Sequence, residues 1–353
     1  MAYFLMFIFL SLSELVSSAG RHFSYRYAGK AYFVLLFSVM VIFAGFRAPG
    51  IDPDYSNYIE WLHSTYDNPG EIFTQFKDPG FTGLYFVLKV LCIPDTIFFC
   101  VVAFISLQAK SVFSKYIMNG AWAYLLFFMI CSRFYIVHDL IQIRVGVAIS
   151  LASCALVSIY RGGRFGALSV YLLALSFHLS VIMFAPIIFM VWFGFRFLNR
   201  FWLILIPALS FGLSGAIVLL SGQLRSIERL APYLNGEYQT TAVSLFSFYF
   251  IVRLALLSFI VSALYRKMSD FERFLVFMSV MGLSLQALLS WNDSLSLRFA
   301  ELFGFFDMAC FLVVTRFFEK KSQMLYATGL VGLGALLYFS STKLVAEYAA
   351  SFS

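Results

Sequence analysis

The chain has 353 residues, of which 61% are hydrophobic and only 12% charged, whereas soluble domains carry about 25% charged residues. This composition excludes a soluble enzyme. The net charge of +7 comes largely from basic residues in short loops, as the positive-inside rule requires, so nucleic acid is not an expected partner. Recurring apolar runs, each long enough for ~30 Å of hydrocarbon, predict an all-α, polytopic integral membrane protein.

We expect about 12 transmembrane helices plus one short re-entrant or interfacial segment, given the ~20 apolar residues that a crossing needs. Residues 1–353 would form a single transmembrane domain with external loops at 47–78 and 222–243. The first run has its basic residues after it, which predicts a retained span with an external amino terminus. The expected spans cover residues 2–19, 30–46, 96–116, 119–137, 140–160, 165–178, 180–195, 201–221, 244–264, 272–290, 297–315 and 323–342.

The first long loop, residues 47–78, is acidic and rich in aromatic residues. Carboxylates accept hydrogen bonds from hydroxyl groups and rings cover the apolar faces of sugars, so this composition favours a sugar-binding loop. The alternative is a turn with solvated aspartates beside proline and glycine. Its candidate residues are Arg47, Asp52, Asp54, Tyr55 and Tyr58.

The apolar piece at 79–93 decides on which side this loop lies. A full crossing by 79–93 would place the acidic loop in the cytoplasm and a basic loop outside, against the positive-inside rule twice. Its 15 residues are also short for a span. We therefore expect a re-entrant or interfacial segment and an external acidic loop.

Polar residues crowd the start of the span expected at 140–160. Arg144 lies within this apolar stretch, and Arg133, His138, Asp139 and Gln142 precede it. A charge there is expensive unless it is paired or hydrated. A continuous helix would place His138 and Asp139 on one face with Gln142. We interpret the group as an anion site in which guanidinium groups hold phosphate. The alternative is an arginine that reaches back to the interface along its own helix.

His178 and Ser180 stand between two apolar segments, and span parity places them on the same membrane side as Arg144. A neutral imidazole beside a sugar hydroxyl is a candidate general base. The alternative is a histidine that makes structural hydrogen bonds.

Four more charged residues are expected on that side. Arg225 and Arg229, in the 222–243 loop, share one face of a short helix. External arginines are atypical by the positive-inside rule, which favours a phosphate-binding role. Arg298 and Glu301 either form a pair within one helix or join the phosphate site.

No cofactor or metal is expected. No Walker A or dinucleotide-binding glycine motif is present, which argues against nucleotide chemistry. The five cysteines lie in or beside apolar segments without the spacing of metal ligands.

These motifs together resemble those of the EpsG family, a branch of the Wzy-type exopolysaccharide and O-antigen polymerases. The resemblance covers most of the chain in the right order. One departure is the spaced Asp52-Pro-Asp54-Tyr55, where the family more usually shows a compact Gly-Thr-Asp-Tyr. The motifs are Gly45-Phe-Arg47, Gly50-x-Asp52-x-Asp54-Tyr55-x-x-Tyr58, Asp78-Pro-Gly-Phe81, Gln142-Ile-Arg144-x-Gly-x-Ala148, Phe177-His178-x-Ser180 and Arg298-Phe-Ala-Glu301.

The resemblance implies an inverting, metal-independent glycosyl transfer at the periplasmic face of a bacterial inner membrane. The donor would be a glycan on undecaprenyl pyrophosphate, and the acceptor a repeat unit on the same lipid. A chain-length regulator and a flippase of the same pathway are the implied partners. Arginines would stabilise the departing pyrophosphate, and His178, Asp139 or Asp54 would take the proton of the attacking hydroxyl.

Three other functions compete with a polymerase. An O-antigen ligase uses the same donor but moves the glycan to lipid A. A membrane-bound acyltransferase would also place a histidine in an apolar segment, without a need for external arginines. A lipid-linked oligosaccharide flippase would line a central path with charges, whereas the candidate charged residues of this chain gather on one side.

Overall fold

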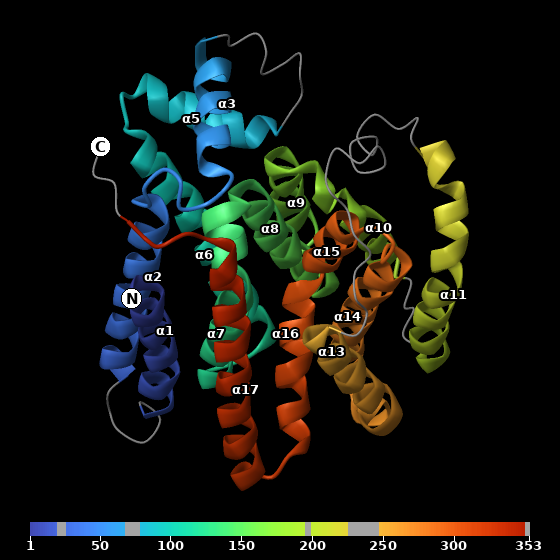
Figure 1. The fold of residues 1–353 in the computed structure, drawn as a ribbon. Helices are drawn as coiled ribbons and strands as arrows, with labels where there is room; N and C mark the ends of the chain where they lie inside the picture. Colours follow the sequence, from blue (N-terminus) through green and yellow to red (C-terminus); the bar gives the residue numbers. More distant parts are fainter. Residues whose placement is uncertain (20–25, 68–77, 195–198, 225–246, 350–353) are drawn as a thin grey trace. The chain divides into compact units, whose positions relative to one another are not determined.

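The computed structural model describes residues 1–19, 26–67, 78–194, 199–224 and 247–349, and the regular elements in these ranges are all helical (Figure 1). Six helices among them are long and apolar enough to cross a membrane, and five shorter apolar helices accompany them. The all-α membrane class is confirmed, whereas the expected number of about twelve crossings is not. The six long helices cover Asp95–Ile117, Ala121–Ile141, Ile143–Tyr160, Phe248–Lys267, Asp270–Leu288 and Lys320–Leu344.

The chain divides into two compact units, residues 1–194 with 324–353 and residues 195–323. That all 353 residues form a single transmembrane domain stays a prediction.

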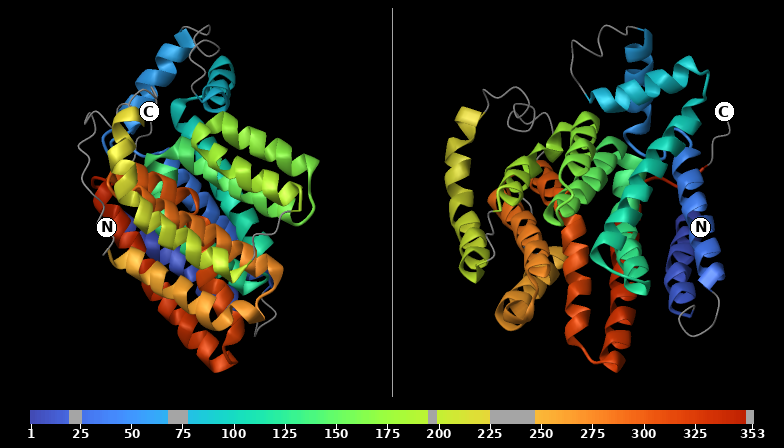
Figure 2. Two further views of the ribbon diagram at one scale, coloured as in Figure 1. Left: turned by 90° about the vertical axis from the view of Figure 1, so that its right-hand side faces the viewer. Right: turned by 180° about the vertical axis from the view of Figure 1, so that it is seen from behind.

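The first unit is built on a bundle of apolar helices. Helix α1 packs on α2 and α7, and α6 packs on α2 and α7, as two views agree (Figures 1 and 2). Aromatic side chains fill the contacts, for example Phe7 against Tyr338 with ring centroids 5.3 Å apart. Gly334 allows α17 to approach Phe128 closely. The helices are α1 (Ala2–Ala19), α2 (Arg26–Gly45), α6 (Asp95–Ile117), α7 (Ala121–Phe134) and α17 (Lys320–Ser341).

Two short helices, α3 (Tyr55–Asp67) and α5 (Pro79–Val90), lie beyond the end of α2 and the start of α6 (Figure 1). Asp95, the first residue of α6, holds both: it pairs with His63 of α3 at 3.0 Å and with Lys89 of α5 at 2.7 Å. Helix α5 has 12 residues, or about 18 Å, which is too short for a crossing, as expected for this segment.

The polar segment before Arg144 departs from the continuous helix that we expected. Helix α7 passes into a π-helical segment, η1 (Tyr135–Ile141), and Gln142, with φ −90° and ψ 56°, ends it before α8 (Ile143–Tyr160) begins. His138 and Gln142 therefore do not share a helix face. Instead, the start of α8 packs against η1 across the break at Gln142. Gly146 lies so close to the His138 carbonyl that a Cβ would stand 2.2 Å from its oxygen.

Helices α8 and α9 (Phe165–Phe177) form a hairpin whose turn is at residues 161–164. They pack along their length, so the start of α8 lies beside the end of α9. A 3-10 turn, η2 (Leu179–Phe184), and α10 (Ala185–Trp192) follow and pack back on α8. The hairpin thus carries Arg144 and His178 to the same end of the first unit.

The second unit centres on α14, which packs against α11, α13, α15 and α16. Ser269 and Glu272 form a capping box at the start of α14, satisfying backbone donors at that end. Glu272 also pairs with Arg316. The helices are α11 (Arg200–Leu224), α13 (Phe248–Phe259), α14 (Asp270–Leu288), α15 (Asp293–Leu302) and α16 (Gly304–Val313).

Candidate functional site

Arg144, the second residue of α8, lies between three other segments. It forms an ion pair with Asp78, and its guanidinium stands 5.2 Å from the ring centre of Tyr58 and 4.9 Å from that of Trp61. Its side chain is 20% exposed, and its Nε has no hydrogen-bond acceptor among the described residues. We call Tyr58, Trp61, Asp78 and Arg144 the Arg144 site. It offers a positioned cation with hydrogen-bonding capacity left over.

Asp78 stands in one of the motifs that resemble the family, but the sequence reasoning did not count it as a site residue. It has left-handed backbone angles, φ 52° and ψ 58°, at the start of α5, so it turns the chain sharply before Pro79. The next residue but one, Gly80, packs on Ser176 of α9, where a Cβ would stand 2.2 Å from the serine Oγ. Only glycine permits this approach. This contact brings Asp78 close to the end of α9, because Ser176 stands two residues before His178.

His178 ends α9 in an extended conformation. Its Nδ1 accepts the backbone N–H of Ser180 at 3.2 Å and lies 2.7 Å from the Ser180 hydroxyl. Because a backbone N–H only donates, Nδ1 carries the lone pair and the neutral ring carries its proton on Nε2. The proton-accepting atom of His178 therefore faces Ser180. If His178 acts as a base, the proton has to reach Nδ1 through the Ser180 hydroxyl, or the substrate hydroxyl has to displace Ser180 from Nδ1.

Tyr58 is buried beneath the Arg144 guanidinium. Burial raises the pKa of Tyr58 to about 12, while the positive charge of Arg144 opposes the shift. The phenol therefore stays protonated at neutral pH. It supplies a ring face to the cation and an O–H donor to the site.

Arg47 and Asp52, two predicted substrate ligands, form an ion pair with each other. The Arg47 Nε donates to the Asp52 carboxylate at 2.7 Å, both side chains are 0% exposed, and a second guanidinium nitrogen donates to the Ala44 carbonyl at 2.6 Å. The guanidinium also lies 5.2 Å from the Tyr55 ring centre and 4.7 Å from that of Phe99. This pair closes the turn from α2 into α3.

Asp54 is half-buried at the start of α3. Its backbone N–H donates to Asp52 at 3.0 Å, so the buried pair also fixes the position of Asp54.

Two predicted residues before Arg144, His138 and Asp139, are buried in the helix bundle. His138 is fully buried and stacks on Phe134 with ring centroids 4.8 Å apart. Asp139 forms a fully buried ion pair with Lys110, whose ammonium group also donates to Ser106 at 3.1 Å. Lys110 neutralises this carboxylate, and breaking such a buried pair would leave an uncompensated charge.

Arg133 and Gln142 flank this segment. Arg133 is half-buried near the end of α7, with its guanidinium 5.5 Å from the Phe134 ring centre. Gln142 is half-buried at the break between η1 and α8.

The other predicted residues belong to the second unit. Arg298 is exposed and Glu301 half-buried, both on α15. Arg225 and Arg229 lie outside the described residues. Their part in a phosphate site stays a prediction.

Sequence reasoning also missed a buried ion pair of the second unit, between Arg253 of α13 and Asp307 of α16, at 2.9 Å. Gln286 accepts from Arg253 at 2.7 Å, and Ser279 donates to Asp307. Arg253, Asp307 and Lys110 all fall inside expected spans. A charge in such a place predicts a buried partner, and that signal was present in the sequence.

No group of three or more metal-binding side chains occurs within the part of the chain that the structure describes. The chemistry available at the Arg144 site is that of a guanidinium, a carboxylate, aromatic rings and a nearby imidazole.

These features define the class of the protein: a polytopic helical membrane protein with a part-exposed arginine site, framed by aromatic rings, at one end of its helices. The chain belongs to the EpsG family, a family of Wzy-like polymerases, whose family model matches residues 30–352. A comparison with curated proteins and with solved structures finds no match.

Proposed function

We propose that the protein polymerises oligosaccharide repeat units carried on undecaprenyl pyrophosphate, at the periplasmic face of a bacterial inner membrane. The observation that carries this proposal is the Arg144 site: a part-exposed guanidinium held by one carboxylate and two rings. Membership of a Wzy-like polymerase family supports the same reaction type.

Arg144 would bind the pyrophosphate of the donor. As the bond from the anomeric carbon to the pyrophosphate oxygen breaks, negative charge grows on that oxygen, and guanidinium N–H groups stabilise it. Asp78 would hold the guanidinium in orientation without occupying all its donors. Tyr58 and Trp61 would keep water from one side of the cation.

The acceptor is a sugar hydroxyl of a second lipid-linked unit. Its oxygen attacks the anomeric carbon opposite the leaving group, so the configuration inverts and no metal is required. We place the departing proton on the His178 Nδ1 through the Ser180 hydroxyl, which the 2.7 Å contact permits. Asp54 is the second candidate base. Asp139 is left out, because Lys110 already neutralises it.

The remaining predicted residues would act around this centre. Arg47 and Asp52 would position Asp54 and Tyr55 rather than touch the substrate. Arg225, Arg229 and Arg298, with Glu301 orienting the last, would supply further cations for pyrophosphate. Arg133, His138 and Gln142 would support the segment that leads to Arg144. A chain-length regulator and a flippase of the same pathway would be the partners.

The decisive experiment is glycan length on a gel from a deletion strain complemented with variants. We expect Arg144→Ala to leave one repeat unit per lipid, a loss of polymer of about 100-fold, the size seen when an oxyanion donor is removed. Lys343→Ala is the matched control, because this exposed cation is outside the site. Equal amounts of the two proteins in the membrane must be verified.

Other outcomes would assign other functions. If the Arg144→Ala strain still makes long chains, the Arg144 site is not the pyrophosphate site. If the deletion strain makes long chains that are not attached to lipid A, the protein is a ligase. If repeat units in the deletion strain stay on the cytoplasmic side, it is a flippase.

A further inference from the structure

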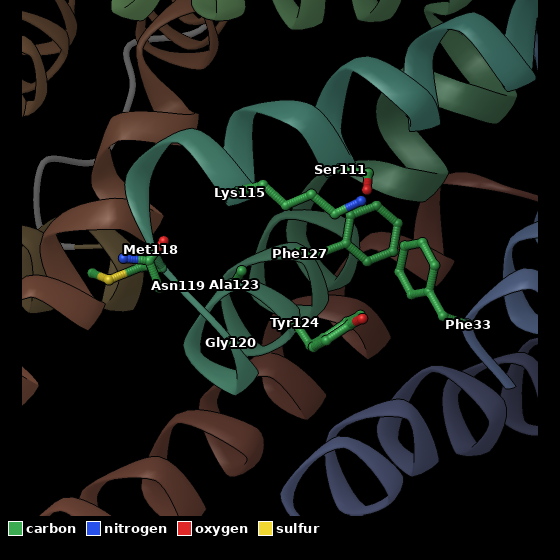
Figure 3. Close-up of a pocket in the computed structure, with 9 residues that line it drawn as sticks. All are labelled: Phe33, Ser111, Lys115, Met118, Asn119, Gly120, Ala123, Tyr124 and Phe127. Atoms are coloured by element: carbon green, nitrogen blue, oxygen red, sulfur yellow. The ribbon is translucent and has the colours of Figure 1, made fainter. Parts of the chain in front are cut away.

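A cavity of about 180 Å³ lies at the turn between α6 and α7, beside α2 (Figure 3). Lys115 and Ser111 of α6, Gly120 and Ala123 at the turn, and the rings of Phe33 and Phe127 are among its lining residues. The cavity is far from the Arg144 site. About 20 residues of α6 separate Asp95, which anchors α3 and α5, from Lys115, a distance of about 30 Å along a helix.

The cation of this cavity has no carboxylate partner among the described residues. Lys115 is exposed, and its ammonium group lies 5.6 Å from the Phe33 ring centre. Figure 3 shows its side chain extended along α6 towards Ser111, which is one helical turn away on the same face. A lysine in this position offers its N–H donors to the cavity.

Ser111 supplies a second, independent donor. Ser111 is 2% exposed and lines the cavity, so what little of it is accessible faces this space. Its hydroxyl can therefore donate to an oxygen-bearing ligand in the cavity.

The start of α7 adds backbone donors. Gly120 precedes this 14-residue helix and provides no side-chain cap. The Ala123 N–H donates to the Gly120 carbonyl at 3.2 Å, so the N–H groups before Ala123 are the ones left without a capping side chain. The positive end of the helix dipole favours an anion there. Cation, hydroxyl and helix end converge on the same kind of ligand.

We propose that this cavity binds a phosphate ester, with Lys115, Ser111 and the start of α7 on the phosphate oxygens and Phe33, Tyr124 and Phe127 around the attached carbon atoms. Two helices long enough to cross a membrane meet at this turn. The cavity therefore lies at the membrane border opposite the Arg144 site, where lipid phosphates are found. The proposal does not depend on the proposed reaction.

The test is binding of dioleoylphosphatidic acid to the full-length purified protein, followed by native mass spectrometry. Dioleoylglycerol has the same chains without phosphate, and inorganic phosphate has no chains. We expect Lys115→Ala to weaken phosphatidic acid binding about tenfold and Ser111→Ala a few-fold, in line with charge-assisted and neutral hydrogen bonds. Lys115→Arg retains most of the binding. Lys343→Ala, which removes an exposed cation elsewhere, changes nothing.

Each outcome decides between alternatives. Competition by millimolar inorganic phosphate would support the phosphate site and identify a soluble phosphate as a sufficient ligand; no competition would identify the lipid ester. If Lys343→Ala weakens binding as much as Lys115→Ala, the attraction is general surface charge and the proposal is wrong. It is also wrong if dioleoylglycerol binds as well as phosphatidic acid. Ser111→Ala removes one buried oxygen, so it tests the site even if Lys115→Ala folds poorly.

Discussion

Two arginine–aspartate pairs of the first unit have the same chemistry and opposite accessibility. Arg47 and Asp52 are 0% exposed and stand five residues apart in the chain, whereas Arg144 is 20% exposed and its partner Asp78 is 66 residues away. Both guanidinium groups face aromatic rings. From the sequence alone, both arginines were predicted to bind the substrate.

The difference between the two pairs lies in which guanidinium an anion from solvent can reach. Burying a charged pair removes it from water, and its donors are then directed to the protein: Arg47 donates to Asp52 and to a backbone carbonyl. The Arg144 side chain is 20% exposed, so an anion from solvent can reach its guanidinium, whereas the Arg47 side chain is 0% exposed. Each guanidinium has one buried nitrogen without an acceptor among the described residues, so exposure is what separates the two. A site for an incoming anion needs the second arrangement, because an anion has to reach the cation and find free donors.

The largest expected effect is a loss of stability when the buried Arg47–Asp52 pair is broken. Asp52→Ala leaves the Arg47 charge uncompensated, and we expect a loss of about 3–5 kcal/mol in stability. The measurement is the melting temperature of the detergent-purified protein. The double variant Arg47→Met with Asp52→Leu should recover much of the loss, because it removes both charges. A stable but inactive Asp52→Ala protein would instead show that Arg47 acts on the substrate.

A smaller effect is expected at the exposed pair. Trp61→Ala removes one ring from beside the Arg144 guanidinium, and a cation–π contact of about 1 kcal/mol corresponds to a several-fold loss of polymerisation. Trp192→Ala is the matched control, because Trp192 lies 5.7 Å from Arg164, a different arginine at the turn of the α8–α9 hairpin. Equal losses from both variants would mean that aromatic packing, not the Arg144 site, sets the activity.

The smallest effect concerns pH. Since burial raises the pKa of Tyr58 to about 12, the folded protein holds the phenolic proton where the unfolded chain has lost it. This residue therefore contributes stability below pH ~10 that is lost as the pH rises towards 12. Tyr58→Phe should show a smaller loss of stability over that window and an unchanged activity profile near neutral pH. A changed profile near neutral pH would mean that the phenol titrates during the reaction.

Part of the site was predictable from the sequence for local reasons. Arg144 stood out because a charge in an apolar stretch requires a partner, and His178 because the spacing of the spans puts it at the same membrane side. The short hairpin between α8 and α9 brings both to one end of the unit, as the sequence spacing predicted.

Other parts depended on contacts between distant segments. Asp78 had no signal as the partner of Arg144, because its position follows from the left-handed turn before α5 and from Gly80 packing on Ser176. The expected face of His138, Asp139 and Gln142 was wrong, because the helix ends at Gln142. Lys110 was overlooked although a lysine in the middle of a span predicts a buried acid.

The sequence by itself determined the membrane class, the positions of the long apolar helices and the presence of costly charges, since these follow from composition and from the free energy of placing groups in hydrocarbon. Only the tertiary structure decided which carboxylate each cation meets and which arginine keeps solvent access. Pairing and burial depend on how helices pack across tens of residues, and side-chain chemistry alone does not encode that geometry. For this reason Arg47 and Arg144, both predicted from the sequence to bind substrate, differ in the structure as a closed pair and an open one.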